Sequence, residues 1–180
     1  GIALASLGRV DEGIQSLTVG LEHARLQGNV RAEAYAITYL ARMLARQNQY
    51  DVALASARQA AHLAENVPGL RGFALAVQAD VLLAQGQPAV ALELATAAMT
   101  ILQELEGVEE GESLIRVVHA LALRGLGHAA EGKRWISVAR RGLRTKAVRI
   151  SDERWRQCFL ENDPDNARLL RVAAHWASAH

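Results

Sequence analysis

QNQYDVAL, at residues 47–54, contains the pattern on which the fold depends, and similar stretches recur as LGRVDEGI (7–14), QGQPAVAL (85–92) and LGHAAEGK (126–133). Each stretch holds one residue suited to a left-handed turn, and these four residues follow one another at intervals of 40, 38 and 41 positions: Gly8, Asn48, Gly86 and Gly127. Glycine and asparagine adopt the left-handed backbone at a helix end with less strain than other residues. The pattern therefore predicts four turns, each joining two helices.

Small residues follow each turn at fixed distances. Five positions after the turn residue lie Gly13, Ala53, Ala91 and Gly132, and seven positions further lie Gly20, Ala60, Ala98 and Ala139. The face between them is filled by Leu17, Ala57, Ala95 and Ile136. Small side chains on one helical face let two antiparallel helices approach closely. The sequence thus predicts close helix crossings in every repeat.

The composition supports an all-helical chain. Of the 180 residues, 51% are apolar but only 4% are aromatic, and alanine and leucine dominate the apolar set. Such a chain is too apolar for disorder and poor in the residues that favour strands. We expect helices over 1–6, 10–27, 30–47, 50–66, 70–85, 88–106, 111–126 and 129–147, with a further helix from Ile150 to Leu160 that Ser151 caps and a last one over 167–176.

These repeats resemble the tetratricopeptide repeat (TPR) family, whose turn has a Gly–x–Tyr–x–x–Ala pattern. Asn48, Tyr50 and Ala53 match it best, and Gly8, Val10 and Gly13 come next. The period near 40 exceeds the usual ~34 and is similar to a long-repeat subclass common in bacterial regulators. The chain departs from the family in lacking a large aromatic residue early in the first helix, and in having Gln78 and His119 where leucine is usual.

The resemblance implies an all-α, right-handed helical-hairpin solenoid, a TPR-like superhelix. We expect about four hairpins over 1–148, the first truncated, and a two-helix cap over 149–180. In this family the first helix of each unit lines a concave groove that holds a peptide or a partner helix. The groove side of this chain is then lined by Tyr35, Thr38, Tyr39, Arg42, Arg46, Phe73, Val77, Asp80, Val118, Leu121 and Arg124. An alternative is that the groove is empty or filled by another part of the parent chain.

The C-terminal segment has apolar residues suited to covering the last repeat: Trp155, Phe159, Leu169, Leu170 and Trp176. The run RWRQCFLENDPDNARLL (154–170) resembles the tail of large bacterial multi-domain regulators, including Ser/Thr kinases and ATPase-bearing transcription activators. Gly1 begins part-way through a helix of a unit. We therefore expect a fragment of a longer protein, with more helix upstream and His180 at or near its natural C-terminus.

No arrangement of residues indicates catalysis, a cofactor or a metal site. Gly127 to Lys133 has the spacing of a phosphate-binding loop, but Arg134 replaces the Ser or Thr that would bind magnesium, and no strand precedes it. The six histidines do not cluster, although we expect His119 to be partly buried, and Cys158 is most simply a packing residue. We predict a non-enzyme with no cofactor, no metal and no membrane span, in the cytoplasm.

Charge is distributed unevenly. Residues 1–132 hold 9 Lys and Arg against 14 Asp and Glu, whereas residues 133–180 hold 11 against 5. An acidic cluster is formed by Glu104, Glu106, Glu109, Glu110 and Glu112; it is either a solvated face or a contact with the basic C-terminal third. That basic third has few aromatic residues and no DNA-reading motif, so it does not favour nucleic acid as a partner.

Three functional hypotheses follow. The first is a protein-interaction or scaffolding module in a bacterial signalling protein, which binds a protein or peptide partner, acidic in character, or other domains of its parent chain. The second is a ligand-sensing domain that controls an upstream kinase or ATPase. The third is self-association through the truncated first hairpin.

Overall fold

The computed structural model describes residues 1–178, and His180 lies outside this range. The described residues form ten helices and no strand: α1 (Ile2–Ser6), α2 (Val10–Leu26), α3 (Val30–Arg46), α4 (Tyr50–Leu63), α5 (Pro68–Ala84), α6 (Pro88–Glu104), α7 (Glu112–Gly125), α8 (Ala129–Val148), α9 (Glu153–Glu161) and α10 (Pro164–Ser178). The helices expected between residues 1 and 147 all form, within three residues at either end.

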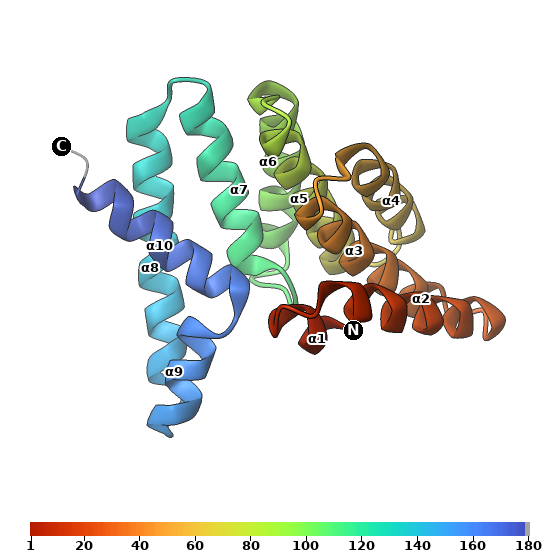
Figure 1. The fold of residues 1–180 in the computed structure, drawn as a ribbon. Helices are drawn as coiled ribbons and strands as arrows, with labels where there is room; N and C mark the ends of the chain where they lie inside the picture. The colour runs from red at the N-terminus through yellow and green to blue at the C-terminus, as the bar shows by residue number, and fades with distance from the viewer. Residues whose placement is uncertain (179–180) are drawn as a thin grey trace.

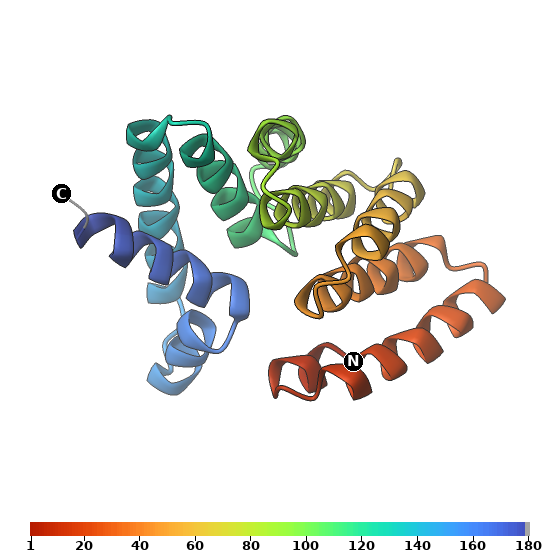
Figure 2. The same ribbon diagram turned by 45° about the horizontal axis from the view of Figure 1, so that its top comes forward.

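Successive helices pair into antiparallel hairpins that follow one another along a curved path (Figures 1 and 2). Each odd-numbered helix from α3 to α9 packs against the two helices beside it in the chain. In addition, α3 packs on α5 and α5 on α7, so these helices form an inner row. The predicted all-α helical-hairpin solenoid is confirmed.

The four predicted turn residues have the backbone that their identities indicate. Gly8, Asn48, Gly86 and Gly127 all have positive φ, at 82°, 61°, 73° and 88°. At each turn an amide beyond this residue donates back into the helix that ends there, as Gln49 does to Leu44 and His128 to Leu123. The turns therefore stop one helix and start the next within three residues.

Most of the small residues that follow the turns are buried where paired helices cross. Ala53, Ala91, Ala60 and Ala98 have no exposed surface, and Ala139 is almost as buried. Gly132 needs its missing side chain, because a Cβ there would lie 2.7 Å from the carbonyl oxygen of Ala120 on α7. Gly20 is the exception: it is exposed, because α1 has only five residues and ends beside the first half of α2.

After α8 the chain folds back, and α10 packs across α7 and α8 (Figure 1). Leu169, Ala173 and Trp176 are buried there, with Phe159 and Leu170 partly buried beside them. The expectation for Trp155 is wrong: its side chain is 70% exposed, because α9 packs through its C-terminal end, at Phe159 and Leu160.

Two helix starts near the C-terminus differ from expectation. Asp152, not Ser151, caps α9 by accepting a hydrogen bond from the Trp155 amide. The last helix begins at Pro164 instead of residue 167, because Asp163 caps it and proline suits the first helical position.

Two glycines of α8 provide a test of the crossing. Gly132→Ala should lower the free energy of unfolding by about 1–3 kcal/mol, because the added Cβ overlaps the Ala120 carbonyl. Gly142→Ala should raise it by about 0.8 kcal/mol, because that position is open and alanine is the better helix former. Urea unfolding followed by circular dichroism measures both. Equal effects at the two sites would contradict the close crossing.

Candidate functional site

One face of α3 lines three neighbouring clefts on the inner side of the solenoid. Tyr35, Tyr39, Arg42 and Arg46 follow one another at spacings of four, three and four residues, which places them on one helical face. Tyr35 lines the first cleft, of about 300 Å³; Tyr39 and Arg42 line the second, of about 210 Å³; Arg42 and Arg46 line the third, of about 360 Å³. We call these the apolar, central and arginine clefts.

The apolar cleft lies between α3 and the ends of α5 and α6. Its walls include Tyr35 and the apolar residues Val67, Leu70, Leu105 and Val108. Arg31 lies 6.0 Å from the centre of the Tyr35 ring and forms an ion pair with Glu109 at 3.1 Å. The cleft thus combines apolar walls with a charged rim.

Tyr39 connects the inner row of helices to residues 105–111, the loop between α6 and α7, at the central cleft. We call this segment the acidic loop, because it holds Glu106, Glu109 and Glu110. Its hydroxyl donates a 2.8 Å hydrogen bond to Glu110, and its ring packs edge-on against Phe73, with ring centres 5.4 Å apart. Burial raises the pKa of the Tyr39 phenol, and the neighbouring Glu110 carboxylate raises it further. The phenol therefore stays protonated and donates its proton to the Glu110 carboxylate.

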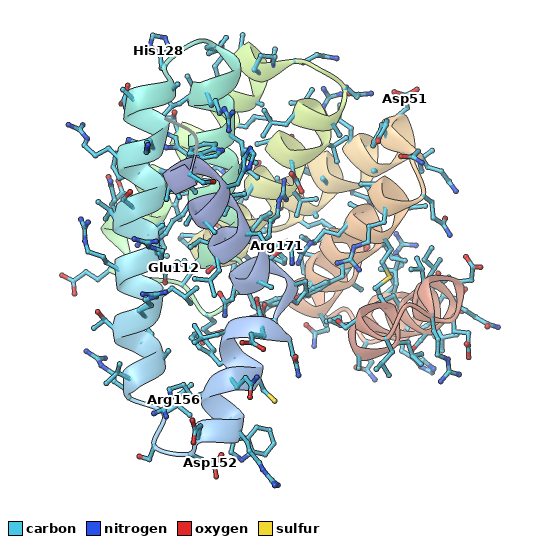
Figure 3. All side chains as sticks on the ribbon, turned by 60° about the vertical axis from the view of Figure 1, so that its left-hand side comes forward. Asp51, Glu112, His128, Asp152, Arg156 and Arg171 are labelled. Carbon is cyan, nitrogen blue, oxygen red and sulfur yellow. The ribbon has the colours of Figure 1, made fainter. Side chains whose placement is uncertain are left out.

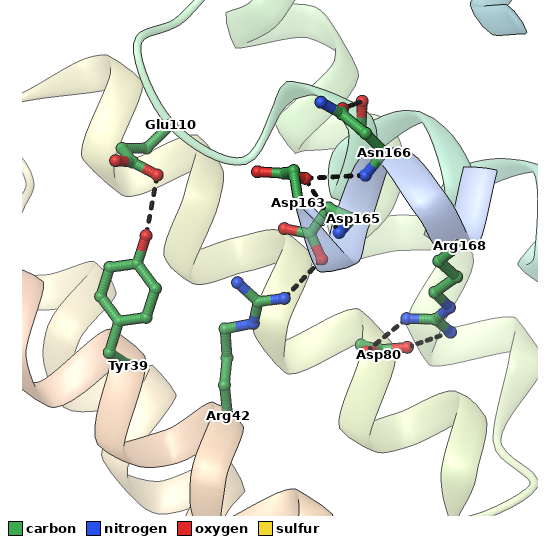
Figure 4. A network of polar contacts seen from close by, with 9 residues as sticks. Tyr39, Arg42, Asp80, Glu110, Asp163, Asp165, Asn166 and Arg168 are labelled. Atoms are coloured by element: carbon green, nitrogen blue, oxygen red, sulfur yellow. Dashed lines mark hydrogen bonds and ion pairs between the residues drawn. The ribbon is translucent and has the colours of Figure 1, made fainter. Parts of the chain in front are cut away.

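The arginine cleft is formed by α3, α5 and α10, and two ion pairs cross it (Figure 4). Arg42 of α3 pairs with Asp165 of α10, and the side chains of both are largely buried. Burial raises the pKa of Asp165 although Arg42 opposes this, so the pair compensates the buried charge only in part. Arg168 of α10 donates two hydrogen bonds, of 2.8 and 2.7 Å, to Asp80 of α5.

Two further arginines line this cleft, and neither forms an ion pair with any residue between 1 and 178. They are Arg46 at the end of α3 and Arg171 on α10, which is labelled in Figure 3. Burial lowers the pKa of Arg46 and the positive charge of Arg42 lowers it further, although the Asp165 and Asp80 carboxylates partly oppose this. The cleft therefore has uncompensated positive charge.

The start of α10 is fixed by a small polar network. Asp163 accepts hydrogen bonds from the amides of Asp165 and Asn166, at 3.0 and 2.8 Å. The buried Asn166 side chain donates to the Phe159 carbonyl on α9 and accepts from Ser113 on α7. These bonds set where Asp165 and Arg168 point.

The acidic cluster serves more than one contact. Glu112 pairs with Lys146 of α8 and with Arg116, so this residue does contact the basic C-terminal third. Glu109 and Glu110 instead contact α3, Glu109 through Arg31 and Glu110 through Tyr39. Burial alone would raise the pKa of Glu112, but the hydrogen bonds and charges of Lys146 and Arg116 outweigh it and lower that pKa.

The residues predicted for the groove divide into two groups. Thr38, Phe73 and Val118 have no exposed surface, so their expected role as partner contacts is corrected: they pack inside the inner row. Val77 is almost fully buried, and its remaining surface lines the arginine cleft. Leu121 packs against the α8–α10 cluster, and Arg124 lies over the Trp176 ring at 4.9 Å. The structure places Tyr35, Tyr39, Arg42, Arg46 and Asp80 at the clefts.

Sequence reasoning missed the contribution of α10 to this site. Asp165, Arg168 and Arg171 lie on the segment expected to cap the last repeat, yet they reach helices more than 80 residues away in the sequence. One signal was available: Asp165, Arg168 and Arg171 are spaced by three residues, which places charges on one helical side.

Residues 1–178 contain no group of three or more His, Cys, Asp and Glu side chains that could hold a metal ion. None of the helices described is long and apolar enough to cross a membrane. His119 is buried more fully than expected, and burial lowers its pKa.

No family model and no curated protein matches the sequence. Among solved structures, the chain is similar to the crystal structure of a TPR-like protein from Chlorobium tepidum, with a TM-score of 0.56 and 18% sequence identity. The similarity covers 92% of this chain and 99% of that one. At this identity it shows the fold alone: the chain has a TPR-like helical-repeat fold.

The lowered pKa of Glu112 predicts a pH-dependent contribution to stability. Its ion pairs stabilise the fold above the ordinary carboxyl value near 4.5 and are lost as the pH falls through the lower folded-state value. Glu112→Gln should therefore cost about 1 kcal/mol at pH 7, and this difference from the unmodified chain should shrink below pH 4.5. Urea unfolding between pH 3 and 7 measures it. Glu93→Gln on exposed α6 surface is the control, and a pH-independent Glu112→Gln effect would refute the assignment.

Proposed function

We propose that this chain is a non-catalytic protein-interaction or scaffolding module that binds a peptide or partner helix on its inner face. The observation that supports this most is the α3 stripe, because four side chains from one helix line three adjacent clefts. Tyrosine and arginine are the residue types that most often anchor protein interfaces. One helix already contacts this face, because α10 packs on α7 and forms ion pairs with α3 and α5.

The ligand chemistry changes along the stripe. Near Tyr35 the walls are mainly aliphatic, whereas near Arg46 they hold four arginines and two aspartates. A segment with apolar side chains at one end and acidic groups at the other would match both ends. The proposal therefore specifies how the partner segment is oriented along the inner face as well as its composition.

The wider context is also a proposal. The tail resemblance supports a C-terminal position in a larger bacterial signalling or regulatory protein in the cytoplasm, with repeats over 1–148 and a cap over 149–180. Other domains of that parent chain are then candidate occupants of the inner face.

A second candidate function is a ligand-sensing domain that controls an upstream kinase or ATPase. The ion pairs Arg42–Asp165 and Asp80–Arg168 support it, because they join α10 to α3 and α5 across the inner face. A ligand that competed for these arginines would change how the C-terminal helix sits against the first repeats.

Binding of designed peptides tests the first proposal. Fluorescein-labelled 12-residue peptides with an apolar half and an Asp/Glu half, made in both orders, are titrated against the chain by fluorescence anisotropy. One order should bind more tightly. Tyr35→Ala and Arg46→Ala should each weaken that binding about tenfold, corresponding to about 1.4 kcal/mol, and added salt should weaken only the Arg46-dependent part.

Arg58→Ala is the matched control, because Arg58 is an exposed arginine on α4 outside the three clefts. Arg42→Ala alone is a less suitable test of binding, because it would also leave the buried Asp165 without its ion-pair partner. If the Tyr35→Ala and Arg46→Ala variants bind both peptides as Arg58→Ala does, the inner-face proposal is wrong.

A further inference from the structure

We infer that the arginine cleft binds a phosphate monoester dianion, held between Arg46 of α3 and Arg171 of α10. This inference rests on the proposed function, because it assigns a ligand group to one end of the same inner face. It adds a site built jointly by the repeats and the C-terminal helix, together with the chemical class of its ligand.

The charge balance of the cleft indicates a dianion. Its walls hold four guanidinium groups and two carboxylates, and two of the guanidiniums are already paired, Arg42 with Asp165 and Arg168 with Asp80. Two positive charges therefore remain. A single carboxylate would neutralise one of them, whereas a phosphate monoester near neutral pH has a charge of about −1.5 to −2.

The donors in the cleft suit phosphate in chemical type as well as in charge. All four cations are arginines, and the planar guanidinium offers paired N–H groups that match phosphate oxygens. Tyr50 lines the same cleft, but its hydroxyl donates to Asn48 at 2.8 Å and is not a free donor. The ligand would therefore be held by arginine N–H groups.

The two ion pairs hold the site in position. Arg168 is fixed by two hydrogen bonds to Asp80. Burial alone would lower the pKa of Arg168, but the Asp80 carboxylate outweighs it and raises that pKa, so this residue stays charged. Arg171 lies three residues further along α10 and therefore projects on a neighbouring side. The floor between the walls is made of small apolar residues, including Val77, Val81 and Ala84.

The space suits a phosphoryl group attached to something larger. The cleft has a volume of about 360 Å³, which is near the lower end for ligand sites. The same phosphoryl chemistry occurs in a phosphorylated side chain of a partner protein and in a small phosphate ester. The test therefore includes one probe of each kind.

Isothermal titration calorimetry on the full chain uses three probes: acetyl-Gly-phosphoserine-Gly-amide, its aspartate analogue, and glycerol 3-phosphate. At least one phosphoester should bind about tenfold more tightly than the aspartate peptide. Its affinity should rise between pH 5.5 and 7.5, because the second phosphate ionisation has a pKa of about 6. A preference for the phosphopeptide would identify a modified partner as the source, and a preference for glycerol 3-phosphate a small metabolite.

Arg46→Gln and Arg171→Gln should each weaken phosphoester binding at least about tenfold, whereas Arg58→Gln should not change it. Neither cleft residue has an ion-pair partner among residues 1–178, so both variants should keep the melting temperature of the unmodified chain. Equal binding of the aspartate peptide, or equal behaviour of all three variants, would overturn the inference. If the phosphate inference fails but the apolar–acidic peptides still bind, the proposed function survives. If those peptides do not bind but the phosphoester does, only the proposed function is overturned.

Discussion

The structure depends on how closely paired helices approach at their crossings. Ala53, Ala91 and Gly132 occupy equivalent places after three of the turns, and each is buried against the partner helix. A larger side chain at any of them would push the helices apart and change the angle between successive hairpins. The curvature of the solenoid, and with it the inner face, therefore follows from the size of these few residues.

Curvature brings together residues that are distant in the sequence. The inner row places α3 and α5 where α10 can reach both of them, although α10 lies about 120 residues after α3. The acidic loop before α7 reaches α3 in the same way, through Glu110 and Tyr39. Each of these contacts joins the first half of the chain to the second. Their polar side chains therefore cover part of the inner face that a simple repeat array would leave exposed to solvent.

The sequence contained most of the fold but only part of the site. Repeated turn residues and small crossing residues are local signals, so the helices and their pairing could be predicted from Gly8, Asn48, Gly86 and Gly127. Which inner residues stay exposed depends on packing between hairpins, and no local pattern shows that Phe73 and Val118 are buried while Tyr35 is not. The docking of α10 depends on three-dimensional curvature, so Asp165 and Arg168 could not be assigned to α3 and α5 in advance.

The sizes of the interaction energies distinguish the contacts that attach α10 from the contacts that orient it. Full burial of α10 side chains such as Leu169 and Trp176 contributes about 1.5–3 kcal/mol each, and both pack against α7 and α8. The partly exposed Asp80–Arg168 pair contributes about 0–1 kcal/mol, and Arg42–Asp165 loses much of its Coulombic gain to burial. Apolar contact therefore attaches α10 to the last hairpin, and the ion pairs set its angle against α3 and α5. Because the weaker interactions control that angle, an anion competing for Arg42 or Arg168 would reorient α10 without detaching it.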